Sequence, residues 1–264
     1  MSAFWSRIVV ALVLLPAVLG IVWLGGWWLT SVALVGGLMA LHELYVMGRG
    51  LRPIVLGGFV GLVLTLLGAQ LGGDVTWMLG GMLATALVAF VLYGVSDARP
   101  SATASISLTL LGVVWVGGGL GCLMLLRAIP DDGRLVVFTV LIAVFADDTA
   151  AYLIGRLLGR HKLAPSLSPG KTWEGFAAGT LAAIAVAFFA LYEQDFLSIP
   201  ESIALGAAVA LAGAAGDLFE SAIKRDLQVK DSGQLLGGHG GMLDRIDSLL
   251  FASVAAFYVV LALA

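Results

Sequence analysis

The sequence predicts an all-α, polytopic integral membrane protein with about nine transmembrane helices, and three observations lead to this fold class. Hydrophobic residues make up 60% of the 264 positions and charged residues only 12%, whereas about a quarter of the residues of a soluble domain are charged. The mean hydropathy of the chain is +1.04. Apolar runs of the roughly 20 residues needed to cross about 30 Å of hydrocarbon recur along the whole chain.

Nine apolar runs account for the predicted spans. They lie at about 8–25, 28–47, 54–73, 75–95, 104–126, 135–155, 174–193, 200–219 and 248–264. The first run continues to Trp27 and Trp28 without a small-residue cleavage site, so we expect a membrane span rather than a cleaved signal peptide. We divide the chain into N-terminal scaffold helices at 1–130 and a C-terminal catalytic region at 131–264, whose polar loops are 155–174 and 220–247.

Lys and Arg residues lie mostly on one side of this arrangement. With the N-terminus inside, twelve of the 14 fall in inner loops, and only Arg127 and Arg134 fall in outer loops. Cytoplasmic loops of membrane proteins carry an excess of Lys and Arg. The sequence therefore predicts that both polar loops face the cytoplasm.

Composition excludes several classes of function and explains the glycines. A net charge of −3, with the helices embedded, leaves no basic surface for nucleic acid. Cys122 is the only cysteine, so no disulfide framework or cysteine metal site is available. Most of the 35 glycines fall inside apolar runs, where small residues let helix backbones approach closely. Three pairs at a spacing of four predict this packing: Gly57 with Gly61, Gly68 with Gly72 and Gly117 with Gly121.

Two of the first six runs carry charged residues. His42 and Glu43 are adjacent near the end of the second run; neighbouring helical residues point about 100° apart, so we expect an interfacial or interhelical hydrogen-bonded pair rather than a shared ligand. In the sixth run, Asp148, Tyr152 and Arg156 share one helix face. An acidic residue inside a membrane segment indicates a functional site; the alternative is an ion pair between Asp148 and Arg156.

The loop 155–174 is basic and contains a Gly-Lys-Thr sequence. It is not a Walker loop, because Pro165 stands where that motif needs glycine and no preceding β-strand is expected. Ser168, Lys171 and Thr172 still offer hydroxyl groups and an ammonium at a helix start, which suits phosphate oxygens. The alternative is a solvated loop that touches anionic lipid headgroups.

The most charged stretch runs from Asp217 to Asp247. It spans 31 positions, holds ten of the chain's 31 charged residues and contains a glycine-rich turn around His239. Backbone amides in such a turn can approach an anion closely. We expect the helix before it to break at 231–233 and Asp244 to share a helix face with Asp247. Carboxylates beside Lys and Arg suit Mg²⁺ and phosphoryl or nucleotidyl chemistry; the alternative is a salt-bridged loop.

This stretch resembles the signature of the phosphatidate cytidylyltransferases, also called CDP-diacylglycerol synthases. The matching positions are Ser221, Ile223-Lys224-Arg225, Lys230-Asp231, Gly233, Leu236, His239-Gly240-Gly241 and Asp244-Arg245-Ile246-Asp247. Two upstream segments, Asp148 to Tyr152 and Ser168 to Gly175, are also similar to segments of the family. The resemblance covers roughly residues 140–255.

The resemblance implies transfer of the cytidylyl group of CTP to phosphatidic acid, with Mg²⁺, by a homodimer in a bacterial inner membrane. The metal ligands are expected to be Asp217, Asp244 and Asp247. The catalytic residues are expected to be Asp217, Lys224, Arg225, Asp244, Arg245 and Asp247. The substrate-binding residues are expected to be Asp148, Tyr152, Ser168, Lys171, Thr172, Ser221, Lys230, Asp231, His239, Gly240 and Gly241.

Two other functions remain open at this point. One is a related CTP-dependent enzyme that acts on another lipid phosphate or a polyprenol, which only substrate testing separates. The other is a polytopic transporter, which predicts acids spread along several spans and an inverted repeat. The charges instead concentrate in two loops on one side, and no internal repeat is visible.

Overall fold

The computed structural model describes residues 16–96, 101–233 and 240–263. Within these ranges eight helices are long and apolar enough to cross a membrane, and residues 16–24 are helical as well. The prediction of an all-α polytopic membrane protein is confirmed. The first predicted run, 8–25, lies partly outside the described residues.

The chain forms two compact units, and the first contains the described residues up to Ala128 together with those of 227–246. Its elements are α2 (Gly26–Met47), the short 3₁₀ helix η1 (Arg49–Leu51), α3 (Val55–Gly72), α4 (Val75–Gly94), α5 (Ala102–Gly112), the π-helical turn η2 (Val113–Gly117) and α6 (Gly118–Arg127). The last three form one continuous span of 26 residues.

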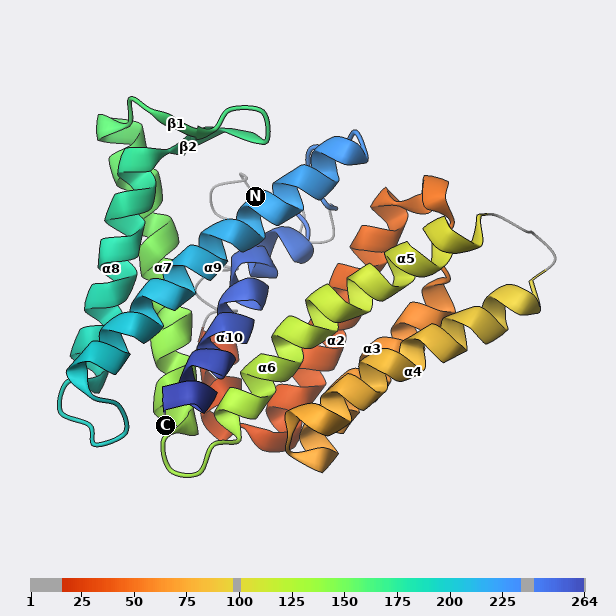
Figure 1. Ribbon diagram of the computed structural model, residues 1–264, viewed down its shortest axis with the longest axis horizontal. Coiled ribbons are helices and arrows are strands. Elements are labelled where there is room, and N and C mark those ends of the chain that lie inside the picture. Colours follow the sequence, from red (N-terminus) through yellow and green to blue (C-terminus); the bar gives the residue numbers. More distant parts are fainter. Residues whose placement is uncertain (1–15, 97–100, 234–239, 264) are drawn as a thin grey trace. The chain divides into compact units, whose positions relative to one another are not determined.

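Helices α3 and α4 of this unit lie side by side (Figure 1), and glycines set their separation. A Cβ atom at Gly68 would lie 2.8 Å from the carbonyl carbon of Trp77, and one at Gly81 would lie 2.6 Å from that of Leu64. Both distances are too short for real contacts, so larger residues would force the backbones apart. The packing role predicted for Gly68 is therefore confirmed.

Buried polar contacts also join the helices of unit 1. The Tyr45 hydroxyl on α2 donates to the Thr109 carbonyl on α5 at 2.9 Å, and the Thr30 hydroxyl donates to the Gln70 side-chain oxygen at 2.7 Å. Such groups need partners because an unsatisfied polar group in hydrocarbon costs several kcal/mol.

The second unit contains residues 129–226 and 247–264. Its elements are α7 (Gly133–Leu158), β1 (Lys162–Ala164), β2 (Ser168–Thr172), α8 (Trp173–Leu191), α9 (Ile199–Asp226) and all but the first turn of α10 (Leu243–Leu263). Helix α8 packs against both α7 and α9 (Figure 1). The close α7–α8 contact depends on Gly175, where a Cβ would lie 2.6 Å from the Ala151 carbonyl oxygen.

The short hairpin of β1 and β2 corrects the expectation that this loop contains no strand. The strands are antiparallel, with Lys162 opposite Thr172. Contacts at the open end hold them together: Trp173 N–H donates to the His161 carbonyl at 2.9 Å, and His161 Nδ1 lies 2.6 Å from Glu174 Oε1. Three residues are too few to show the alternating hydrophobic pattern of a strand, so the sequence did not predict this hairpin. The exclusion of a Walker loop rests on Pro165 and stands.

Helix α9 also differs from the prediction. It continues past the apolar run 200–219, as the expected break at 231–233 requires, but it ends earlier, at Asp226. Gln228 follows with φ of 57°, a left-handed conformation that a continuing helix does not adopt.

Candidate active site

Unit 2 contains a cavity of about 640 Å³ between α7, the hairpin, the start of α8 and α9. This volume falls within the range of roughly 300–1,000 Å³ that is typical of small-molecule sites. Its polar lining is given by Asp147, Asp148, Tyr152, Arg156, Lys162, Ser168, Lys171, Thr172 and Asp217. Six of these, all but Asp147, Arg156 and Lys162, are among the predicted site residues.

Helix α7 places one face on this cavity. Asp148, Tyr152 and Arg156 all line it, which confirms that they share a helix face. Arg156 Nη1 donates to the Tyr152 hydroxyl at 2.9 Å, and the ion pairs among the described residues do not include one between Arg156 and Asp148. The Asp148 side chain therefore lines the cavity without an ion pair to Arg156.

The hairpin and α9 meet at an ion pair in the cavity wall. Lys171 Nζ on β2 lies 2.7 Å from Asp217 Oδ2, and both side chains are partly exposed. The second Asp217 oxygen, Oδ1, accepts a weak hydrogen bond of 3.4 Å from the Ser221 hydroxyl one turn later. Arg225 Nε, at the end of the same helix, approaches the Leu167 carbonyl between the strands at 3.5 Å. Predicted residues from both polar loops therefore come together here.

Thr172 has a structural contact that the sequence did not assign. It is the N-cap of α8, and its hydroxyl accepts a hydrogen bond of 3.2 Å from Gly175 N–H. An N-cap side chain satisfies one of the backbone N–H groups that lack partners in the first helical turn. Its residue surface is 4% exposed, so the hydroxyl is committed to the helix start.

We expect Thr172→Val to lower the free energy of unfolding by about 1 kcal/mol, because the cap is lost while the side-chain shape remains. Thr172→Ser keeps the hydroxyl and should retain most of the stability. Thermal unfolding of both variants in detergent measures this. A Thr172→Val protein with unchanged unfolding temperature but lost activity would instead show that the hydroxyl binds substrate.

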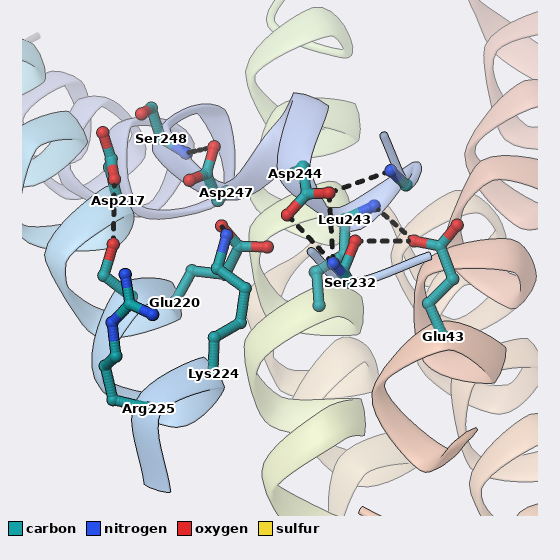
Figure 2. A network of polar contacts seen from close by, with 12 residues as sticks. Glu43, Asp217, Glu220, Lys224, Arg225, Ser232, Leu243, Asp244, Asp247 and Ser248 are labelled. Atoms are coloured by element: carbon teal, nitrogen blue, oxygen red, sulfur yellow. Dashed lines mark hydrogen bonds and ion pairs between the residues drawn. The ribbon is translucent and has the colours of Figure 1, made fainter. Parts of the chain in front are cut away.

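Three further acidic or cationic side chains gather beside Asp217 (Figure 2). Lys224 Nζ is paired with Glu220 Oε2 at 2.7 Å, and Glu220 is only 2% exposed. Asp247 on α10 is buried, and its Oδ1 accepts from Ser248 N–H at 2.8 Å. The ion pair between Lys224 and Glu220 agrees with the alternative of a salt-bridged segment. Asp217 differs, because it also lines the cavity.

Two carboxylates of unit 2, Asp148 and Asp217, line the same cavity. Asp217 lies close enough to repel both Asp148 and Asp247 electrostatically. Among the residues that the structure describes, no group of three or more acidic, His or Cys side chains is arranged so that it could hold a metal ion by itself. Mg²⁺ does not require such a group, because it binds one or two carboxylates and takes its other ligands from water and substrate phosphates.

Asp244 belongs to unit 1, where its carboxylate binds the turn before α10 (Figure 2). Its Oδ2 accepts from Gly241 N–H at 2.9 Å and from Ser232 N–H at 3.2 Å. Gly240 has φ of +79°, and a Cβ there would lie 2.9 Å from Asp244 Oδ2. This turn requires glycine for both its conformation and its close approach.

The other predicted residues of this segment have fewer described contacts. Lys230, Asp231 and Arg245 are exposed to solvent. His239 lies outside the described residues. Their roles stay predictions.

The sequence pointed only weakly to two polar residues of these regions. Asp147 lines the cavity beside Asp148 and is 7% exposed; the signal that points to it in the sequence is that two acids, Asp147 and Asp148, are adjacent in an apolar run. Glu43 on α2 is 2% exposed and accepts hydrogen bonds from the segment that leads into α10. An interhelical hydrogen bond was predicted for it, but its partners were not.

A polytopic membrane fold whose polar cavity combines carboxylates with two lysines and an arginine is typical of a membrane-embedded enzyme for phosphate-bearing substrates. The chain belongs to the cytidylyltransferase family, whose model matches residues 5–263.

Named relatives agree with this assignment. A phosphatidate cytidylyltransferase of Staphylococcus haemolyticus is 36% identical over 251 residues and covers 93% of each chain. One from Mycobacterium bovis is 34% identical over 255 residues, which is 88% of this chain and 79% of the relative. A Mycobacterium leprae relative of the same name is 44% identical over 132 residues, 48% of this chain and 41% of its own.

Proposed function

We propose that this protein transfers the cytidylyl group of CTP to phosphatidic acid and releases pyrophosphate. A phosphate oxygen of phosphatidate attacks the α-phosphorus of CTP, a new P–O bond forms, and the bond from the α-phosphorus to the bridging oxygen of the β-phosphate breaks. The products are CDP-diacylglycerol and pyrophosphate. The attacking oxygen is already an anion, so no general base is needed.

The Lys171–Asp217 pair in the wall of the 640 Å³ cavity is the observation that carries this proposal. It joins the polar loop 155–174 to the charged stretch that begins at Asp217, in a cavity whose lining is both ionic and apolar. Such a lining suits a triphosphate and a lipid at once. The transporter alternative loses support, because Asp148, Lys171 and Asp217 converge on one cavity.

The chain's own residues supply orientation and charge. Lys171, Lys224 and Arg225 offer positive charge to phosphate oxygens, which lowers the energy of the developing negative charge. Asp148 and Asp217, which line the cavity of unit 2, would hold Mg²⁺, and Asp247 and Asp244 keep their predicted roles as metal ligands. When bound, Mg²⁺ neutralises phosphate charge and aligns the reacting oxygens.

The setting of the enzyme is part of the proposal. Its relatives are bacterial, which favours the plasma membrane, and the excess of inner Lys and Arg favours an active site on the cytoplasmic side, where CTP is available. We also propose a homodimer, as the family resemblance implies.

Incubation of the purified protein in detergent with labelled CTP, Mg²⁺ and phosphatidic acid tests the reaction. We expect label in the lipid, stoichiometric pyrophosphate, and loss of both with EDTA that excess Mg²⁺ reverses. Polyprenyl phosphate in place of phosphatidic acid should give no labelled lipid. Label that appears only with the polyprenyl substrate would establish the alternative acceptor. If the protein does not bind CTP, the hypothesis that it is a transporter would be favoured again.

A further inference from the structure

Glu43 is an acidic residue inside a membrane helix, and its carboxylate binds three hydrogen-bond donors (Figure 2). Oε1 accepts from Met242 N–H at 2.9 Å. Oε2 accepts from Leu243 N–H at 2.9 Å and from the Ser232 hydroxyl at 3.2 Å. A carboxylate only accepts, so it satisfies all three donors together, although they lie about 190 to 200 residues away in the sequence.

The partners of Glu43 are the start of α10 and the segment before it. Helix α10 begins at Leu243, and the first N–H groups of a helix have no partner within it. A negative charge there also interacts favourably with the helix dipole. Glu43 therefore fixes where and in which direction α10 begins within unit 1.

The same segment holds Asp244. Ser232 donates its hydroxyl to Glu43 and its N–H to Asp244, and Figure 2 shows Ser232 between the two carboxylates. Gly241, whose N–H donates to Asp244 at 2.9 Å, directly precedes Met242, whose N–H donates to Glu43. The two carboxylates thus bind the same short backbone segments.

Glycine packing shows that the fit around Glu43 is close. A Cβ at Gly233 would lie 2.8 Å from Glu43 Oε1, and one at Gly241 would lie 2.5 Å from Oε2. Neither position has room for a side chain while Glu43 keeps this position, so the backbone at both glycines packs directly against the Glu43 carboxylate. On the same face of α2, Gly36 is contacted by Met242, whose Cε would lie 2.8 Å from a Cβ there.

We propose that Glu43 is a positioning residue for the reaction: through Ser232 and the Met242–Leu243 backbone it sets the orientation of the Asp244 carboxylate. The inference rests on the proposed function, in which Asp244 holds Mg²⁺. Helix α2, which was predicted to belong to the N-terminal scaffold, would then have a role in the reaction.

Glu43→Gln tests this with little change in volume. One acceptor oxygen becomes an NH₂ donor that faces N–H groups, so the segment must shift. We expect turnover to fall about tenfold to a hundredfold, and the Mg²⁺ concentration for half-maximal rate to rise by a similar factor, as for other residues that orient metal ligands. Glu43→Asp, which keeps the carboxylate, should recover part of the loss.

Tyr45→Phe is the matched control. Tyr45 lies on the same helix, is equally buried and loses one hydrogen bond, to the Thr109 carbonyl, but does not contact the segment. Its unfolding temperature should fall while its Mg²⁺ dependence stays unchanged. If Glu43→Gln behaves like Tyr45→Phe, Glu43 is only structural and the inference is wrong.

Hydrogen exchange of residues 240–246 provides a readout that does not need activity. Glu43→Gln should speed exchange there and Tyr45→Phe should not; equal rates in both variants would overturn the inference. Should Glu43→Gln not fold, Ser232→Ala removes only the hydroxyl contact and should shift the Mg²⁺ dependence or the exchange rate in the same direction. A wild-type protein that labels no lipid would instead contradict the proposed function, while the exchange result would still decide the role of Glu43.

Discussion

Asp217→Asn is expected to lower turnover on the order of a thousandfold. The substitution removes the negative charge that is proposed to bind a metal ion and that forms an ion pair with Lys171. Asparagine has nearly the same shape, so α9 should fold as before. Lys171 loses the ion pair of 2.7 Å, and the cavity wall loses one of the contacts that join the hairpin to α9. Lipid labelling under saturating CTP and Mg²⁺ measures the effect.

Asp226→Asn is the matched control for this variant. Asp226 is the last residue of the same helix and is exposed to solvent, so its loss should leave turnover within about twofold, as for most surface substitutions. Asp217→Asn protein that turns over as fast as Asp226→Asn would remove Asp217 from the active site.

Asp244→Asn is expected to abolish turnover while the protein stays folded in the membrane. The asparagine oxygen can still accept one of the hydrogen bonds from Gly241 and Ser232, but the negative charge proposed to hold Mg²⁺ is gone. Turnover at increasing Mg²⁺, together with the unfolding temperature, separates the loss of metal from the loss of structure.

Asp195→Asn, an exposed acid between α8 and α9, controls for the removal of one charge. Near-normal turnover by Asp244→Asn at ordinary Mg²⁺ would rule out Asp244 as a metal ligand. Activity restored only at high Mg²⁺ would support the assignment, because weakened binding is overcome by concentration.

The features that could be predicted from the sequence are those that depend on local patterns of residues. Apolar runs gave the spans because hydrocarbon thickness sets helix length, and the spacing of Asp148, Tyr152 and Arg156 gave a shared face because the helix repeat is fixed. The resemblance and the charge density located both polar loops. None of these depends on which helix lies beside which.

Tertiary pairings could not be predicted in the same way. Lys171 and Asp217 were both expected at the site, but their ion pair depends on how the hairpin folds over α9. The hairpin was missed because its strands have three and five residues and are held by His161 and Glu174 at their open end. The partners of Glu43 lie too far away in the chain for any local pattern to indicate them.

The lengths of α7 and α9 bear on the depth at which the cavity would lie in a bilayer. Their 26 and 28 residues span about 39 and 42 Å, roughly 10 Å more than the hydrocarbon layer. Upright helices whose outer ends stand at the hydrocarbon edge would place Asp148, ten residues before Leu158, and Asp217, nine before Asp226, within about 8 Å of the opposite edge. Phosphatidate would then meet these acids without leaving its leaflet. The reaction rate should therefore depend on bilayer thickness, because a thicker membrane draws the ends of α7 and α9 inward and sinks the acids below the lipid phosphates.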